Sequence, residues 1–411
     1  MALIVQKYGG TSVAEVERIR NVARKVGAMR DKGNDMVIVL SAMSGETDRL
    51  LRLAHQIAPN PSEREMDVMM ATGEQVSVAL LAIALQSMGY RACSYLGHQV
   101  KILTDRSFTK ARIKEIDREK ILQDLKKGYV VIVAGFQGVD KENNITTLGR
   151  GGSDTSAVAI AAALEADVCE IYTDVDGIYT TDPNICSNAR KLEKISYDEM
   201  LEMASLGAKV LQIRSVGLAK KFNVPLCVKS TFTECTGTVV TREDMIMEKV
   251  LVAGITYDTK EAKITIKSVP DVPGVAARIF EPLSNANIVV DMIIQNASED
   301  GKADVTFTIP KADYRKAMEI VRRVGREMDA LDVQGDENIA KVSIVGTGMR
   351  DHPGVAAQMF STLGNEGINI MMISTSEIKI SCVIEDKYTE LAVRVLHDVF
   401  GLAEPSAQGS T

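Results

Sequence analysis

Residues 129–175 decide the fold class of the first half of the chain. The segment contains YVVIVAGFQG at 129–138, TSAVAIAAALEA at 155–166 and VCEIYTDV at 168–175. The outer two runs have the apolar centres of strands buried on both faces, whereas the middle run is typical of a helix. A strand, a crossover helix and a second strand predict a parallel sheet sandwiched by helices.

The same alternation extends over the first 230 residues. The runs are ALIVQK (2–7), a helical run at 16–33, DMVIVLS (35–41) and a long helical run that begins at SERE (62–65). SERE and SYDE (196–199) have the capping-box pattern that marks a helix start. Residues 230–260 then mix polar turns with short apolar pieces. We therefore expect an α/β, three-layer αβα domain at 1–235 and a second region at 249–411.

The C-terminal region contains an internal repeat. AKITIKSVPDVPGVAARIFEPLSNANIVVDMI at 262–293 matches AKVSIVGTGMRDHPGVAAQMFSTLGNEGINIMMI at 340–373. Each unit predicts a strand, a Pro-Gly turn, a helix, two strands and a helix. The first unit (262–338) ends in a strand-like piece, but the second (340–400) does not. Because an open sheet edge is unfavourable, we expect the strand-like KVLVAGITY at 249–257 to complete the second unit, with the first unit inserted.

Composition excludes several classes of protein. The chain has 411 residues, a net charge of −7 and 45% hydrophobic residues, which argues against a general nucleic-acid binder. The start, MALIVQKYGG, lacks the order of a signal peptide. The apolar run VALLAIAL (78–85) is too short for a membrane span, so we expect a buried helix and no membrane association. The six cysteines form no C-x-x-C pair, which indicates reduced thiols in a cytoplasmic protein.

Histidine is scarce, and none of the four histidines lies in a glycine-rich loop of the N-terminal half. Metal-hydrolase and Ser-His-Asp chemistry are therefore disfavoured. A carboxylate nucleophile needs no general base, because it is already ionised at pH 7. A kinase that acts on a carboxylate requires positioning and charge neutralisation above all.

Three polar loops in the first domain are candidates for such a site. KYGGTS (7–12) follows a strand, where ligands bind in open α/β sheets, so Lys7 is a candidate for phosphate or carboxylate binding; the alternative is a strand–helix turn with a solvated lysine. Ser41 and Thr47 in SAMSGET suit a small polar ligand, or form a simple cap and turn. Glu74 lies in an apolar helical stretch, where it either meets a ligand's ammonium group or pairs with an arginine.

The loop TLGRGGSDTSA (147–157) precedes a predicted helix, whose N-terminus attracts anions. Arg150 can bind a carboxylate through two parallel hydrogen bonds. Ser153 and Asp154 fall where an N-cap belongs. Asp154 is either a plain cap or a group that orients Lys7 or a metal–phosphate group.

YTDVDGIYTTDPN (172–184) predicts a strand, a turn and a short hairpin. Tyr179 is placed to face a nucleotide base, and Thr173 and Asp174 lie at the strand end. Lys209, in GAKVLQIRS, is expected on the first turn of a helix, where it suits a phosphate. Each of these residues is alternatively a solvated surface residue.

Taken in order, KYGGTS, SAMSGET, GE, TLGRGGSDTSA, TDVDGIYTTDP and GAKVL resemble the aspartate kinase family of the amino-acid kinase superfamily. The repeat with its PGVAA cores resembles the paired, ferredoxin-like βαββαβ ACT regulatory domains of that family. The resemblance covers roughly residues 2–400. It implies transfer of a phosphoryl group from Mg-ATP to the β-carboxylate of L-aspartate. The product, 4-phospho-L-aspartate, leads to lysine, threonine, methionine and diaminopimelate.

The resemblance also implies roles for individual residues. The catalytic pair is Lys7 and Asp154; Glu74 meets the α-amino group of aspartate and Arg150 its α-carboxylate. The remaining substrate residues are Ser41, Thr47 and Ser153, and the ATP residues are Lys7, Tyr8, Gly9, Gly10, Thr173, Asp174, Tyr179, Asp182 and Lys209. Asn184 stands where the family often has arginine. Magnesium is expected to be held mainly by the ATP phosphates, with no dedicated metal site in the protein.

For the repeat, the resemblance implies amino-acid effectors, with lysine and threonine expected, bound at a dimer interface between ACT units. The residues of that wall are Asp271, Pro273, Gly274, Val275, Gln295, Asn369 and Ile370. A homo-oligomer is implied, and a separate short regulatory chain that starts at Met245 or Met247 is a further hypothesis. Two alternatives remain open: a kinase for glutamate, acetylglutamate or a nucleoside monophosphate, and a catalytically silent amino-acid sensor.

Overall fold

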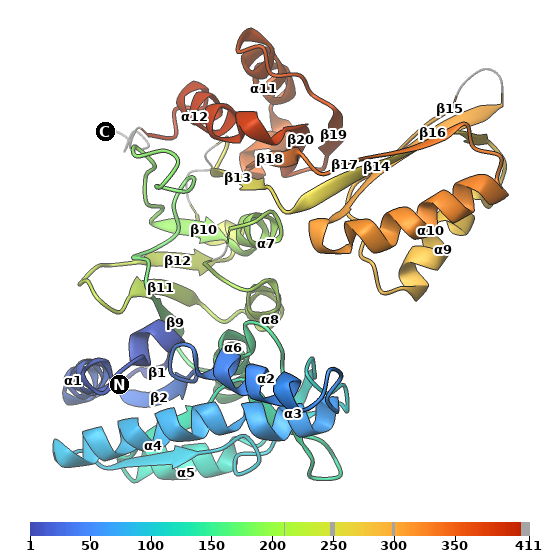
Figure 1. Cartoon of the computed structure of the whole chain (residues 1–411). Helices are drawn as coiled ribbons and strands as arrows, with labels where there is room; N and C mark the ends of the chain where they lie inside the picture. Colours follow the sequence, from blue (N-terminus) through green and yellow to red (C-terminus); the bar gives the residue numbers. More distant parts are fainter. Residues whose placement is uncertain (209, 247–250, 298–300, 404–411) are drawn as a thin grey trace, which may run out of the picture. The chain divides into compact units, whose positions relative to one another are not determined.

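The computed structural model describes residues 1–208, 210–246, 251–297 and 301–403 (Figure 1). The chain forms two compact units. The first comprises Met1–Ile178, Lys191–Ser205 and Lys209–Glu248, and the second comprises Tyr179–Arg190, Leu206–Ala208 and Lys249–Thr411. The chain thus passes from the first unit into the second and back before it reaches the C-terminal region.

The first unit is built on a mainly parallel sheet with strand order β10-β12-β11-β9-β1-β2-β6-β3. Its strands are β1 (Leu3–Tyr8), β2 (Asp35–Leu40), β3 (Ala92–Tyr95), β6 (Val130–Ala134), β9 (Val168–Thr173), β10 (Lys194–Ser196), β11 (Leu226–Ser230) and β12 (Thr238–Thr241). A smaller sheet joins β4 (Ile102–Thr104), β5 (Ile113–Ile116), β7 (Gln137–Val139) and β8 (Ile145–Thr147). Of the central strands, β2 and β6 are apolar and buried on both faces, as predicted for a sheet covered twice, whereas β1 and β9 carry the buried polar residues Gln6 and Glu170.

Helices cover both faces of the main sheet. On one face, α1 (Val16–Asp31) and α4 (Thr72–Ser87) form a core with the strands, to which Ile38, Leu40, Leu81 and Leu85 contribute. On the other face lies α6 (Gly152–Leu164), with α8 (Ile213–Phe222) packed beside it. The remaining helices of the unit are α2 (Glu46–Ile57), α3 (Glu63–Met70), α5 (Glu119–Lys126) and α7 (Tyr197–Ser205). The predicted three-layer αβα architecture is confirmed.

Local predictions for the helix starts had mixed outcomes. Ser196 and Glu199 exchange hydrogen bonds between side chain and backbone, as the capping-box pattern predicts. Ser62 precedes α3 but makes no side-chain cap. The single helix predicted from there is two helices, which meet at Ala71. The stretch Glu63–Ser87 is long and apolar enough to cross a membrane by length and composition alone, and 50% of its most apolar 18-residue window is buried.

The second unit contains two antiparallel sheets, each flanked by a pair of helices. The first sheet has the order β15-β16-β14-β17, and α9 and α10 cover one of its faces (Figure 1). Its elements are β14 (Glu261–Pro270), α9 (Val275–Asn285), β15 (Ile293–Ala297), β16 (Lys302–Pro310), α10 (Tyr314–Glu327) and β17 (Asp332–Asp336). The chain order is therefore βαββαβ.

The second sheet takes one strand from far upstream in the chain. Its order is β13-β18-β20-β19, and β13 pairs antiparallel with β18. Its elements are β13 (Gly254–Asp258), β18 (Ile339–Val345), α11 (Val355–Asn365), β19 (Met372–Thr375), β20 (Lys379–Glu385) and α12 (Thr389–Val399). The strand expected at 249–257 begins only at Gly254, and residues 247–250 lie outside the described part of the chain.

Candidate active site

The loops of the candidate site start side by side at one edge of the main sheet. Tyr8, the last residue of β1, pairs with Leu40 at the end of β2 and with Tyr172 near the end of β9. Backbone hydrogen bonds continue beyond the strands: Ser41 N–H donates to Tyr8 O at 3.1 Å, and Gly9 N–H donates to Tyr172 O at 3.2 Å. The carboxyl ends of parallel strands are where open α/β sheets bind ligands.

Lys7 and Asp154 form an ion pair at this edge. Lys7 projects from β1 toward α6, and its Nζ lies 2.6 Å from Oδ1 of Asp154. The two side chains are only 11% and 10% exposed. Asp154 Oδ1 makes this ionic contact without a hydrogen bond of good geometry. A nearly buried ammonium group held by one carboxylate is well placed to neutralise a phosphoryl group.

The start of α6 differs from the prediction for it. Gly151, with φ of 69°, is the N-cap, so Ser153 and Asp154 lie inside the first turn. A Cβ at Gly151 would lie 1.9 Å from Cγ of Gln212, so both conformation and space require glycine there. The assignment of Ser153 and Asp154 as caps is therefore wrong, and Asp154 is free to pair with Lys7. An acidic side chain in the first turn also interacts favourably with the helix dipole.

Glu74 is a buried carboxyl group that has no ion-pair partner among the described residues. It is 3% exposed, and its Oε1 accepts a hydrogen bond of 3.0 Å from the N–H of Ala42. Its Oε2 has no hydrogen-bond partner among the described residues. Burial raises the pKa of Glu74 to about 7, against the opposing effect of the Ala42 N–H. No arginine pairs with Glu74 in the described part of the chain, so the protein supplies no counter-charge there that would compete with the ammonium group of a ligand.

Glycine makes this arrangement of Glu74 possible. A Cβ at Gly73 would lie 2.8 Å from Cβ of Ala42, closer than real side chains pack. The first turn of α4 therefore approaches the loop after β2 closely enough for the Ala42 N–H to reach Glu74. In the dipeptide GE, glycine is therefore required by packing, and glutamate supplies the carboxyl group of the site.

Replacing Glu74 by glutamine is expected to change how stability depends on pH. Between the pKa of 4.5 in the unfolded chain and about 7 in the folded one, the folded protein holds a proton that the unfolded chain releases. Wild-type stability is therefore lost as the pH rises through 7. Relative to the wild type, Glu74→Gln should raise the free energy of unfolding by about 2 kcal/mol more at pH 8 than at pH 5. Urea unfolding measures this, and an equal gain at both pH values would contradict it.

The other residues predicted to bind the substrate aspartate lie on loops and helix starts that follow strands of the main sheet. Ser41 follows β2, and Thr47 lies in the first turn of α2. Ser153 lies in the first turn of α6, which is held near the end of β6 by a hydrogen bond from Phe136 N–H to Oγ of Ser156. Arg150 is exposed on the loop that leads into α6.

The predicted ATP residues are divided between the two units. Thr173 is the last residue of β9 in the first unit and Asp174 follows it, with the Thr173 hydroxyl 3.1 Å from Oδ1 of Asp174. Tyr179 and Asp182 belong to the second unit. Lys209 lies outside the described residues, and the next described helix, α8, begins at Ile213.

Two residues that help to build the site have no motif in the sequence. Asp67 of α3 is fully buried and accepts hydrogen bonds from Thr147 N–H and Oγ1 at 2.8 and 2.6 Å. It therefore anchors the start of the loop that carries Arg150. Thr231, after β11, shares a 2.6 Å hydrogen bond with Ser12 of the KYGGTS loop. For Asp67, the signal in the sequence was an aspartate among the apolar residues of α3.

In the second unit, the predicted effector residues lie on loops and at helix starts, except Gln295, which lies within β15. Gln295 Nε2 lies 3.4 Å from Oδ1 of Asp271, which brings these two together. Val275 is buried at the start of α9, after Pro273 and Gly274. Asn369 and Ile370 precede β19.

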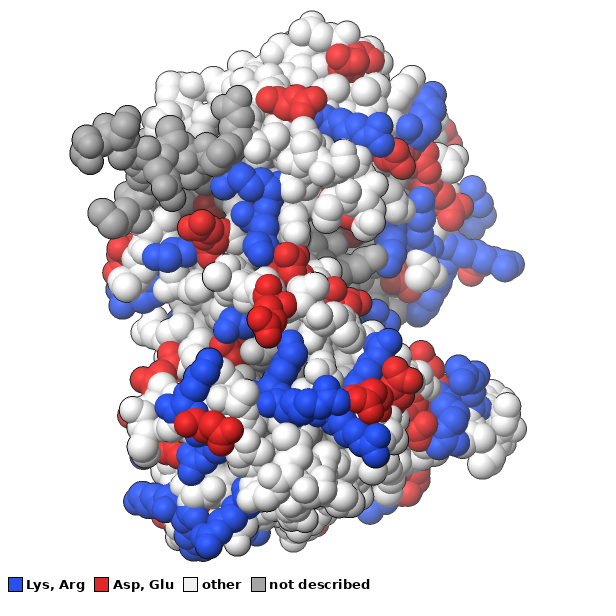
Figure 2. Space-filling view, turned by 90° about the vertical axis from the view of Figure 1, so that its left-hand side faces the viewer, with Lys and Arg blue, Asp and Glu red and all other residues white. Residues whose placement is uncertain are grey.

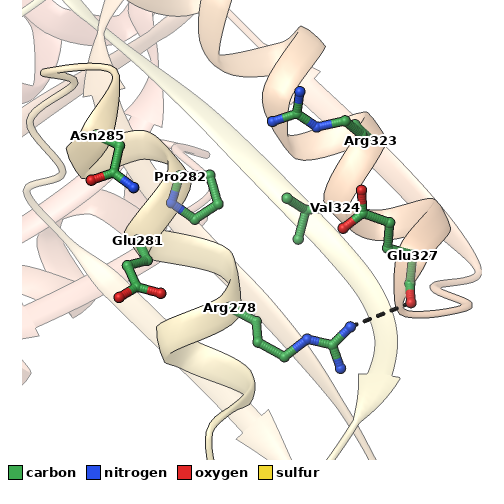
Figure 3. A pocket seen from close by; sticks show the side chains of 7 residues that line it. All are labelled: Arg278, Glu281, Pro282, Asn285, Arg323, Val324 and Glu327. Atoms are coloured by element: carbon green, nitrogen blue, oxygen red, sulfur yellow. Dashed lines mark hydrogen bonds between the residues drawn. The ribbon is translucent and has the colours of Figure 1, made fainter.

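A separate groove of about 490 Å³ lies between α9 and α10 (Figure 3). It is lined by Arg278, Glu281, Pro282, Asn285, Arg323, Val324 and Glu327. None of these is a predicted effector residue, and the Arg278 side chain is oriented toward the backbone oxygen of Glu327, 3.4 Å away. Elsewhere, basic and acidic side chains are interspersed over the face seen in Figure 2, without a continuous basic surface there.

Comparison with known proteins decides the family. The model of the amino acid kinase family matches residues 2–230, and an ACT domain model matches 266–324 and 342–400. An aspartate kinase of Pseudomonas putida is 59% identical over 410 residues, which cover 100% of both chains. The chain belongs to the aspartate kinase family.

Other aspartate kinases are similar over nearly the whole chain. The aspartokinase of Corynebacterium glutamicum is 49% identical and matches 98% of this chain and 97% of its own. The structure of E. coli aspartokinase III in complex with aspartate and ADP has a TM-score of 0.79 and 27% identity, and covers 97% of this chain and 99% of its own. A structure of the same enzyme with lysine and aspartate has a TM-score of 0.78, also at 27% identity, with 96% and 99% covered.

Proposed function

We propose that this aspartate kinase transfers the γ-phosphoryl group of ATP to the β-carboxylate of L-aspartate. The products are 4-phospho-L-aspartate and ADP, and the reaction is the first step toward lysine, threonine, methionine and diaminopimelate. The observation that carries the proposal is the combination of the Lys7–Asp154 ion pair with the unpaired carboxylate of Glu74. One group suits a phosphoryl anion, and the other suits an ammonium cation.

The chemistry needs few groups from the protein. An oxygen of the aspartate β-carboxylate attacks the γ-phosphorus, and the bond from that phosphorus to the bridging oxygen of ADP breaks. The attacking carboxylate is ionised at pH 7, so no proton has to be removed. Lys7 stabilises the charge on the transferring group, and Asp154 holds the Lys7 ammonium in place. Because the reaction needs no general base, the absence of histidine from the proposed site residues is expected.

The aspartate molecule carries three charges for recognition. Glu74 binds the α-ammonium group through its unpaired oxygen, and Arg150 binds the α-carboxylate. Ser41, Thr47 and Ser153 complete the pocket with hydroxyl groups. Ion pairing with the substrate would compensate the cost of keeping Glu74 charged and buried.

We assign ATP to Lys7, Tyr8, Gly9, Gly10, Thr173, Asp174, Tyr179, Asp182 and Lys209. The described residues contain no cluster of three or more His, Cys, Asp or Glu side chains that could hold a metal ion. Mg²⁺ would be carried mainly by the ATP phosphates, whose charge it neutralises when bound. Asp154, Asp174 and Asp182 are the acidic side chains among the residues proposed for catalysis and ATP.

A substrate panel tests the proposal. The protein, ATP, Mg²⁺ and hydroxylamine are incubated with L-aspartate, L-glutamate, N-acetyl-L-glutamate or a nucleoside monophosphate. We expect hydroxamate with L-aspartate alone. Hydroxamate from another acid, or phosphate transfer to the nucleotide, without product from aspartate would refute it.

For regulation and assembly, we propose domains at 1–235 and 249–411, with ACT units at 262–338 and at 249–257 plus 340–400. Lysine and threonine are the proposed effectors of a cytoplasmic homo-oligomer that assembles through these units. All six cysteines are free, which fits a reducing compartment. Activity titrated with lysine, threonine and both together tests the effectors, and a native gel tests the oligomer and a short chain from Met245 or Met247.

A further inference from the structure

The segment Tyr179–Arg190 belongs to the regulatory unit, although it lies within the residues matched by the kinase family model. The chain leaves the first unit after Ile178 and returns to it at Lys191. The segment carries Tyr179 and Asp182, two of the proposed ATP residues. What holds this segment therefore bears on nucleotide binding.

Thr180 is fixed through every polar group that it has. Its N–H donates to Arg190 O at 2.9 Å, and its carbonyl accepts a 2.7 Å hydrogen bond from Ile255 N–H of β13. Its hydroxyl oxygen accepts from Arg190 N–H at 3.0 Å and lies 2.9 Å from Nε2 of His397 in α12. Thr180 and His397 are both fully buried. Because Tyr179 directly precedes Thr180 in the chain, these contacts restrict where its backbone lies.

Asp182 provides a second attachment. Its Oδ1 accepts a 2.9 Å hydrogen bond from the backbone N–H of Asn184, and its Oδ2 accepts a 3.1 Å bond from the hydroxyl of Tyr257 in β13. A little further on, Arg394 of α12 donates to the carbonyl of Ile185 at 2.8 Å. One strand and one helix of the second ACT unit, β13 and α12, thus hold the segment.

We propose that His397 and Tyr257 are positioning residues for ATP, which act by holding residues 180–182 and thereby Tyr179. The proposal rests on the assignment of Tyr179 to the nucleotide side of the site. Neither His397 nor Tyr257 touches substrate. When either side chain is lost, the segment is less ordered in the free protein. Part of the free energy of ATP binding is then used to order it, so the affinity for ATP falls. Burial lowers the pKa of His397, so its contact with Thr180 at pH 7 is a neutral hydrogen bond.

The test measures steady-state kinetics of the full chain with ATP and aspartate varied separately. We expect Tyr257→Phe and His397→Leu each to raise KM for ATP about tenfold, as for loss of one buried hydrogen bond. KM for aspartate and kcat should stay within about twofold. His397→Gln, whose amide can reach the Thr180 hydroxyl, should recover most of the ATP affinity. The matched control is Tyr388→Phe in the same unit, where the ring lies 4.8 Å from Lys387 Nζ.

Tyr179→Ala separates this inference from the site assignment. If Tyr179→Ala raises KM for ATP but Tyr257→Phe and His397→Leu do not, the positioning role is overturned and the assignment stands. If Tyr179→Ala leaves KM for ATP unchanged, the assignment falls and the inference falls with it. Tyr257→Phe removes a single hydroxyl at a partly buried position, so it decides the question even if His397→Leu does not fold.

Discussion

Replacing Lys7 by methionine is expected to lower kcat for aspartate phosphorylation about 1,000-fold. The Lys7 ammonium is the group that stabilises the transferring phosphoryl, and one preorganised charge of this kind is worth roughly that factor. Methionine keeps the length of the side chain but leaves Asp154, which is 10% exposed, without its partner. Lost activity could therefore reflect lost stability, and the experiment must separate the two.

The double variant Lys7→Met/Asp154→Asn makes that separation. It removes the orphaned carboxylate, so the thermal midpoint should return toward that of the wild type. If the missing charge is the cause, kcat stays low in the double variant. Lys32→Met, at an exposed position after α1, is the control and should behave as wild type. Recovery of kcat together with stability would show that Lys7 has no electrostatic role.

Aspartate binding is expected to release a proton from Glu74. The carboxyl group has a pKa of about 7 in the ligand-free protein, so it is largely protonated at pH 6. An incoming ammonium group stabilises the carboxylate and expels that proton. We expect kcat/KM for aspartate to be about tenfold lower at pH 6 than at pH 8. Calorimetry in buffers of different ionisation enthalpy should count about 0.9 proton released at pH 6 and about 0.1 at pH 8.

Glu74→Gln should abolish both the proton release and the pH dependence, while KM for aspartate rises about 100-fold because an ammonium loses its buried counter-charge. Glu119→Gln, an exposed change on α5, should retain wild-type behaviour. Proton release that persists in Glu74→Gln would assign the titration to another group.

Sequence patterns predicted the gathering of the site because parallel strands end at one edge. Once Lys7, Ser41 and Thr173 are each placed at the carboxyl end of a strand, the sheet brings the loops that follow together. The repeat likewise predicted two sheets of the same kind, and an open edge is a physical reason to seek a fourth strand. These inferences need only the spacing of apolar residues within each element and the order of the elements along the chain.

Three features were beyond that kind of argument. The cap of α6 depends on the positive φ of Gly151, which local sequence left undecided among neighbouring candidates. The role of Asp67 depends on loops that meet it only after folding. The membership of Tyr179–Arg190 in the second unit depends on tertiary contacts with His397 and Tyr257, more than 70 residues away in the chain.

The pairing of β13 with β18 imposes an order on biosynthesis. The ribosome delivers β13 first, ending at Asp258, but its partner strand begins only at Ile339. In the interval the first ACT sheet has time to form, while β13 has an unsatisfied edge. The contacts that hold the segment Tyr179–Arg190 form later still, because His397 lies in the last described helix. A nascent chain therefore acquires a folded kinase core well before its nucleotide-side segment is held, so on this proposal full affinity for ATP arrives with the last described helix.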